Sequence, residues 1–159
     1  MKYLKYLYGL IAAIILTTIV PMTTYAADPV SVPADIQSYC EEAGAQYNIC
    51  PELLEAIAWK ESRFTPTARN RSCVGLMQIK AGCHKDRMAK LGVTDLTDAR
   101  SSIFVAADYL SELTATYESP EVVLALYNGD SNALTPGYVS NYASSILQVS
   151  QDLERAHGK

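Results

Sequence analysis

The chain has 159 residues, of which 49% are apolar and 19% charged, with 13 basic side chains against 17 acidic ones. This length and composition suit one globular domain and exclude a wholly disordered protein. The net charge of −4 disfavours binding to a phosphate backbone, so nucleic acid is not an expected partner.

The start of the chain has the pattern of an export signal. Two lysines precede a charge-free stretch over residues 9–20, and small residues stand at the two positions that a signal peptidase reads. We therefore predict a signal peptide over residues 1–26, cleaved after Ala26, and a short leader over residues 27–33. The predicted localisation is secreted or cell-envelope. An uncleaved segment that anchors the protein in the membrane is the alternative, because the apolar run is close to the minimum length for spanning.

After the leader, apolar residues recur at helical spacing. Pro51 suits the first turn of a helix, and Thr65 is expected to end that helix because a residue before proline leaves the α region. Ser101 and Ser102 are expected to cap a later helix. Helices are predicted over residues 34–46, 51–64, 84–91, 103–117, 119–128 and 139–156.

The stretch over residues 67–82 is poor in helical pattern and contains turn residues around the sequence VGLMQI. It allows one small β-hairpin. The predicted fold class is therefore all-α, with one mainly helical domain over residues 34–159 and at most a small β-hairpin near the GLMQI segment.

The cysteines form an even set, which in an exported chain favours two disulfides over free thiols. Four cysteines allow three pairings, and the sequence selects none of them. Zinc binding is the alternative, but no CxxC motif is present, so no metal is expected. The disulfide candidates are Cys40, Cys50, Cys73 and Cys83.

A carboxylate stands out near the end of the second predicted helix. Glu61 continues the apolar stripe of Leu54, Ile57 and Ala58 at positions i, i+3, i+4 and i+7. Burial and the negative end of the helix dipole should both raise its pKa. A carboxylic acid that stays protonated is what a general acid for a glycosidic oxygen requires. The alternative is a structural glutamate at the rim of the core that pairs with a nearby arginine.

Several ordered motifs surround this residue: ELLEAIAWKESRFTPTA, VGLMQI, HKDRMAKLGVTDLTDARSSIFVAADYLSEL, LALYNGD and YASSIL. Together they resemble the catalytic domain of soluble-lytic-transglycosylase-like enzymes in the lysozyme-like superfamily. The resemblance implies a lysozyme-like fold with Glu61 as the sole catalytic acid. It assigns Tyr142 to the tyrosine of the last helix, with Tyr138 as a competing assignment. It implies that Ser62 packs or hydrogen-bonds behind Glu61. The substrate-binding residues that it implies are Ser62, Gly75, Leu76, Met77, Gln78, Ile79, Tyr127, Asn128 and Tyr142.

The resemblance also implies a reaction. Glu61 would protonate the oxygen between N-acetylmuramic acid and N-acetylglucosamine in a peptidoglycan strand, then take the proton of the muramyl 6-hydroxyl as a 1,6-anhydro ring closes. This route needs no cofactor. The expected partner is the glycan strand alone, with the protein acting as a monomer and touching the membrane only through an uncleaved signal segment.

Two other functions compete with this one. A lysozyme-type muramidase would use Glu61 with a second carboxylate that directs water. The second carboxylate would be Asp130 or another aspartate. Asp130 stands where the family pattern has no carboxylate, and it either points into the groove or merely ends a helix on the surface. The other competitor is an inactive module that binds glycans through its tyrosines.

Overall fold

The structure is a computed structural model, and the residues that it describes are 30–159. The predicted signal peptide and the first part of the leader fall within residues 1–29, outside the described residues. Between residues 30 and 159, no helix is both long enough and apolar enough to cross a membrane. The elements are α1 (Ala34–Tyr47), α2 (Pro51–Ser62), β1 (Arg69–Asn70), β2 (Cys73–Val74), η1 (Ala81–Cys83), α3 (Lys85–Leu91), α4 (Ala99–Thr116), α5 (Pro120–Tyr127) and α6 (Asn141–Ala156).

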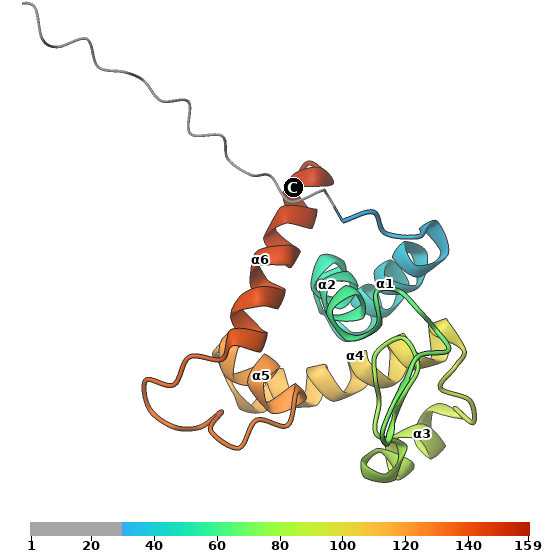
Figure 1. The fold of residues 1–159 in the computed structure, drawn as a ribbon. Coiled ribbons are helices and arrows are strands. Elements are labelled where there is room, and N and C mark those ends of the chain that lie inside the picture. Colours follow the sequence, from blue (N-terminus) through green and yellow to red (C-terminus); the bar gives the residue numbers. More distant parts are fainter. Residues whose placement is uncertain (1–29) are drawn as a thin grey trace, which may run out of the picture.

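The helices enclose a single apolar core. Helix α2 packs against α1 and α6, while α4 packs against α1, α3 and α5. Figure 1 shows α6 on one side of α2 and the hairpin with α3 on the other. The predicted stripe of α2 faces this core, because Leu54 and Ile57 are fully buried together with Leu110 of α4 and Ile146 of α6. The all-α prediction is confirmed.

The predicted hairpin is also confirmed. Strands β1 and β2 are antiparallel, with Asn70 opposite Cys73, and a further bridge joins Val74 to Ile79. Gly75 then turns the chain with a φ of +87°. A Cβ atom at this position would lie 1.9 Å from the backbone oxygen of Leu96, so only glycine fits.

Two predicted helix boundaries are wrong. Helix α4 begins at Ala99, because the carboxylate of Asp98 accepts a hydrogen bond from the N–H of Ser101 at 2.8 Å and caps the helix earlier. Helix α2 ends at Ser62 rather than before Pro66. Arg63 and Phe64 both adopt left-handed backbone angles, and both side chains contact the ring of Trp59.

The prediction of two disulfides is not borne out, since all four cysteines among the described residues are free thiols. Cys40 is completely buried on the core face of α1. Cys50, ten positions later, is exposed, and its thiol donates to the carboxylate of Glu52 at 3.1 Å. Spacing along the chain therefore did not predict how these side chains are directed.

Two buried carboxylates of α2 were not predicted. Glu52 and Glu55 are each only 1% exposed. Burial raises the pKa of Glu52, but hydrogen bonds from Lys159, His157 and Cys50 outweigh that effect and bring the pKa to about 2. Glu55 has no hydrogen-bond partner for either oxygen within residues 30–159, and burial raises its pKa to about 7.

Replacing Glu55 by methionine should stabilise the protein, and more strongly at high pH. The folded-state pKa of about 7 lies above the ordinary 4.5, so the parent loses stability as the pH rises from 4.5 through 7. A methionine has no charge to bury. We expect the free energy of unfolding to increase by about 1–3 kcal/mol at pH 8 and by less at pH 5.

Urea denaturation at the two pH values measures this difference. The exposed Glu118→Met variant serves as the control and should change little at either pH. An equal gain for Glu55→Met at both values would show that ionisation of Glu55 does not limit stability.

Candidate active site

A cleft of about 550 Å³ lies beside the end of α2. The hairpin, the turn after it, η1, α4 and α5 complete its walls. The lining residues are Glu61, Asn70, Cys73, Gln78, Ile79, Lys80, Cys83, His84, Tyr109, Leu126, Tyr127, Asn128 and Gly129. In this lining, Glu61 is the only carboxylate and Lys80 the only lysine or arginine.

Glu61 reaches the cleft from the last turn of α2. Its side chain is half-buried, and its Oε1 accepts a hydrogen bond from the hydroxyl of Tyr142 in the first turn of α6. Burial raises the pKa of Glu61, and the Tyr142 hydrogen bond and the nearby Lys60 charge offset part of that rise. The predicted direction of the pKa shift is thus confirmed.

The two tyrosines that compete for one role lie in different places. Tyr142 contacts Glu61, whereas the hydroxyl of Tyr138 donates to Oδ2 of Asp130 at 2.5 Å. Asp130 also accepts from the N–H of Asn132 at 2.9 Å, and it does not line the cleft. Its carboxylate therefore stabilises the turn after α5.

Only part of the GLMQI segment faces the cleft. Gln78 and Ile79 line it, but Gly75, Leu76 and Met77 do not, which corrects the prediction for these three residues. Leu76 and Met77 are fully buried in the core, because the tight turn at Gly75 directs them inward.

Hydrogen bonds between backbone groups and the side chains of Ser102, Tyr127 and Gln78 hold this segment in place. The N–H of Met77 donates to Oγ of Ser102, and its carbonyl accepts from the hydroxyl of Tyr127 at 2.9 Å. The side-chain nitrogen of Gln78, Nε2, donates to the backbone carbonyls of Gly75 and Ala68. The side-chain oxygen of Gln78 is consequently the atom that remains for a ligand.

Ser62 does not line the cleft, which corrects its place among the substrate-binding residues, but it lies behind Glu61 as the resemblance implies. Its hydroxyl donates to the carbonyl of Ala58 at 3.2 Å and accepts from the N–H of Thr65 at 3.1 Å. Ser62 therefore closes the end of α2 behind Glu61. Tyr127 and Asn128, at the end of α5, line the cleft as predicted.

One wall of the cleft was missed by the sequence analysis. His84 packs on Tyr109 with ring centroids 4.7 Å apart, and Tyr109 lies 5.9 Å from Tyr127. These aromatic residues come from three separate elements, so no local pattern joins them. Nowhere in residues 30–159 do three or more His, Cys, Asp or Glu side chains cluster as metal ligands would.

Removing the hydroxyl of Tyr142 should raise the pKa of Glu61 further. The hydrogen bond favours the ionised carboxylate, so a Tyr142→Phe variant loses that stabilisation. Carboxyl NMR titration of parent and variant measures the shift. Tyr138→Phe is the matched control and should leave the pKa of Glu61 unchanged; a lower pKa in Tyr142→Phe would contradict the geometry.

Comparison with known proteins gives a consistent result. The model of the transglycosylase SLT domain family matches residues 38–146. The invasion protein IagB of Salmonella typhimurium is 33% identical over 115 residues, which cover 67% of this chain and 71% of that protein. The peptidoglycan transglycosylase gp16 of Escherichia phage T7 is 32% identical over 105 residues, covering 62% of this chain but only 8% of the phage protein.

A solved structure shares the fold. An inactive mutant of the lytic transglycosylase Slt from Pseudomonas aeruginosa superposes with a TM-score of 0.66 at 18% sequence identity. The superposition covers 77% of this chain and 24% of that one, so the chain spans about a quarter of its structural neighbour. The lysozyme-like fold is thereby confirmed.

Proposed function

Because this chain belongs to the transglycosylase SLT domain family, it is a peptidoglycan lytic transglycosylase, and we propose that Glu61 is its catalytic acid. The observation that carries this proposal is the position of Glu61, which is the only carboxylate among residues 30–159 that lines the cleft and is half-buried with a raised pKa. A protonated carboxyl group that faces a groove can donate to a glycosidic oxygen near neutral pH.

In the proposed first step, Glu61 protonates the oxygen that joins N-acetylmuramic acid to N-acetylglucosamine, and the bond to the muramyl anomeric carbon breaks. The acetamido oxygen of the substrate then stabilises the positive charge on that carbon. Tyr142 supports this role because its hydroxyl holds the Glu61 carboxyl in one orientation. Tyr127, Asn128, Gln78 and Ile79 are the proposed contacts for the saccharide.

In the second step, Glu61 is ionised and takes the proton of the muramyl 6-hydroxyl. The freed oxygen attacks the anomeric carbon, which closes a 1,6-anhydro ring and restores the protonated acid. Because nucleophile and electrophile belong to the same sugar, the reaction gains a large effective molarity and needs no positioned water. One carboxyl group therefore serves both steps.

Hydrolysis is the less favoured alternative. Glycosidases that hydrolyse with two carboxylates place them about 5–9.5 Å apart on either side of the bond. Asp130 was the candidate for the second carboxylate, but it is hydrogen-bonded to Tyr138 and Asn132 and does not line the cleft. This geometry supports transglycosylation over hydrolysis.

Mass spectrometry of digested peptidoglycan tests the proposed function. Fragments that end in 1,6-anhydromuramic acid, 18 Da lighter than their hydrolysed equivalents, are the expected products. Reducing ends as the main product would assign the protein to the muramidases instead. Binding without any cleavage would identify an inactive glycan-binding module.

The Asp130→Asn variant is expected to give the same ratio of anhydro to reducing ends as the parent. Its carboxylate stabilises a turn, so the change removes no group from the cleft. Both proteins are compared on the same peptidoglycan preparation. A marked fall in reducing ends for the variant would mean that Asp130 directs water and that hydrolysis is part of the normal reaction.

An enzyme that acts on peptidoglycan works outside the cytoplasm, at the cell wall. We further propose that residues 1–26 direct export and that the monomeric catalytic domain occupies residues 34–159. N-terminal sequencing of the exported protein should begin at Ala27. Extraction of the full-length chain only with detergent would instead support an uncleaved anchor.

A further inference from the structure

The cleft also carries two donor side chains that the proposed reaction does not use. Lys80 follows the GLMQI turn directly, lines the cleft and is exposed. Its ammonium group makes no hydrogen bond or ion pair with any of the described residues, and only its backbone carbonyl is engaged, as acceptor for the N–H of Cys83 at 2.9 Å. His84 lines the same cleft from the start of α3.

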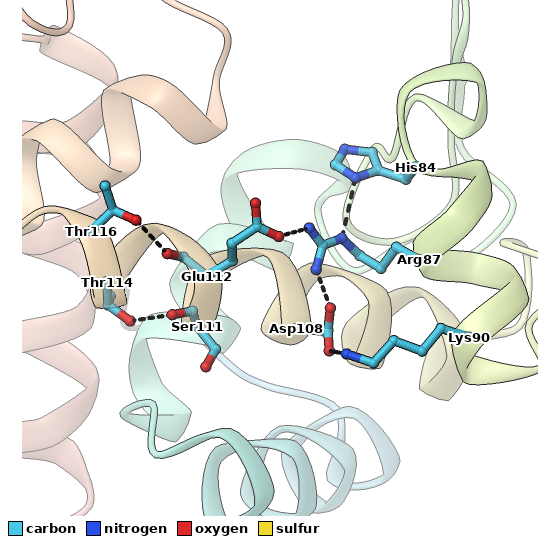
Figure 2. A network of polar contacts seen from close by, with 8 residues as sticks. All are labelled: His84, Arg87, Lys90, Asp108, Ser111, Glu112, Thr114 and Thr116. Carbon is cyan, nitrogen blue, oxygen red and sulfur yellow. Dashed lines mark hydrogen bonds and ion pairs between the residues drawn. The ribbon is translucent and has the colours of Figure 1, made fainter.

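A hydrogen bond from its neighbour selects one tautomer of the neutral His84 ring. Nε of Arg87 donates to Nδ1 of His84 at 3.4 Å, so Nδ1 acts as an acceptor. The proton of the neutral ring must then be on Nε2. Figure 2 shows Arg87 between His84 and the carboxylates of Asp108 and Glu112.

Arg87 is itself fixed by its surroundings. It is 12% exposed, pairs with Asp108 and Glu112, and lies over the ring of Tyr109 at 5.1 Å. The two carboxylates balance its charge together with that of Lys90, which pairs with Asp108 at 3.2 Å. The unbalanced positive charge that faces the cleft is therefore that of Lys80.

We propose that Lys80 and His84 bind a carboxylate of the peptidoglycan strand, with Arg87 as the residue that positions His84. Lys80 offers three N–H donors and His84 offers Nε2–H, and neither presents an acceptor to the cleft. A carboxylate, which only accepts and carries a negative charge, complements this pair. The inference rests on the proposed function, because it takes the glycan strand as the ligand.

Two groups of the strand carry this chemistry. A muramyl residue without a peptide has a free lactyl carboxylate, which N-acetylglucosamine lacks. Where a stem peptide is attached, the lactyl group is an amide and the carboxylates belong to the peptide. Recognition of either would distinguish muramyl strands from a chain of N-acetylglucosamine alone.

Calorimetric measurement of the affinity for three tetrasaccharides tests the proposal. Every protein in the series carries Glu61→Gln, so that the ligand is not cleaved during the measurement. The ligands are chitotetraose, which has no carboxylate, a peptide-free muramyl tetrasaccharide, and the same sugar with stem peptides. Compared with Glu61→Gln alone, the double variant that also carries Lys80→Met should bind at least one muramyl ligand about three- to tenfold more weakly, as expected for the loss of an exposed charge-assisted contact. Binding of chitotetraose should not change.

Comparison of the two muramyl ligands shows which carboxylate the protein binds. A loss restricted to the peptide-free sugar identifies the lactyl group, and a loss restricted to the peptide-bearing sugar identifies the stem. Lys85→Met removes the same charge from a residue outside the cleft and should leave all three affinities unchanged. An equal loss for chitotetraose, or no loss for either muramyl ligand, would overturn the proposal.

The positioning role of Arg87 has its own measurement. Arg87→Lys keeps the positive charge beside Asp108 but cannot hold Nδ1 of His84 through Nε. Like His84→Phe, it should lower the affinity for the muramyl ligand relative to chitotetraose. A purely structural role for Arg87 would lower both affinities together and would contradict positioning.

Failure of this inference differs from failure of the proposed function. If the parent produces anhydro ends while Lys80→Met keeps its ligand selectivity, only the carboxylate site is wrong. If the parent cuts no peptidoglycan and no muramyl ligand binds, the proposed function is wrong as well.

Discussion

A Glu61→Gln variant is expected to fold normally and to lose at least about 10²-fold of the activity on peptidoglycan, since general acid catalysis contributes about 10²–10⁴-fold. The amide nearly matches the carboxyl in shape but cannot donate a proton as an acid. The loss should approach the upper end of this range, because the same group acts in both proposed steps. Tyr142 can still donate to the amide oxygen, so the local geometry should persist.

The pH dependence provides a second readout of the same residue. In the proposed mechanism the acid form of Glu61 starts the reaction, and burial raises its pKa above the ordinary 4.5. The rate should therefore fall as the pH rises through this raised pKa. In the pH–rate profile, the midpoint of this fall should lie above pH 4.5. A midpoint at or below pH 4.5 would contradict the burial of the Glu61 carboxyl group.

Two controls make the activity result interpretable. A thermal melt followed by circular dichroism shows whether the variant is folded, and Glu118→Gln repeats the chemical change on an exposed residue outside the cleft. Near-normal activity of a folded Glu61→Gln protein would mean that another group donates the proton.

Gly75→Ala should be severely destabilising, by more than about 3 kcal/mol, because a backbone clash adds to the cost of a strained backbone angle. The added Cβ would lie 1.9 Å from the oxygen of Leu96 and 3.0 Å from Oγ of Ser102. The Leu96 oxygen belongs to the backbone, and the short Ser102 side chain is buried, so neither atom can easily move away from the added Cβ. The serine hydroxyl also accepts the hydrogen bond from Met77, so the turn that presents Gln78 should be displaced.

Gly92→Ala is the matched control. This glycine also has a left-handed φ, +68°, but nothing lies within 4 Å of its added Cβ. Its substitution should cost only the conformational penalty of about 1–2 kcal/mol. Chemical denaturation measures both variants, and equal losses would show that the contact with Leu96 is not what requires glycine at position 75.

Local physics was sufficient to predict the burial of Glu61 and most of the helices, whereas its proposed catalytic role came from the family resemblance. A carboxylate that continues an apolar stripe is visible at helical spacing, and Glu61 is half-buried with the predicted pKa shift. The two errors at helix ends arose because nearby side chains, rather than the residues expected from the sequence, set where the helix begins or ends. Asp98 caps α4 ahead of the two serines, and Arg63 with Phe64 ends α2 through contacts with Trp59.

The rest of the cleft depends on tertiary structure. The resemblance identified GLMQI as a unit, but the turn at Gly75 decides that Leu76 and Met77 enter the core while Gln78 faces the cleft. Lys80, His84 and Tyr109 come together only when α3 packs on α4. The cysteine prediction failed for a similar reason, since the sequence spacing did not reveal that Cys40 faces the core.

The contact between Glu61 and Tyr142 spans 81 positions of the chain. It forms only when α6 docks on α2, which brings together two helices from opposite ends of the described chain. Contacts of such long sequence separation form late, after the loop between them has closed. A partly folded chain therefore lacks the proposed active site, so under this proposal the enzyme can cut the cell wall only once α6 has docked on α2.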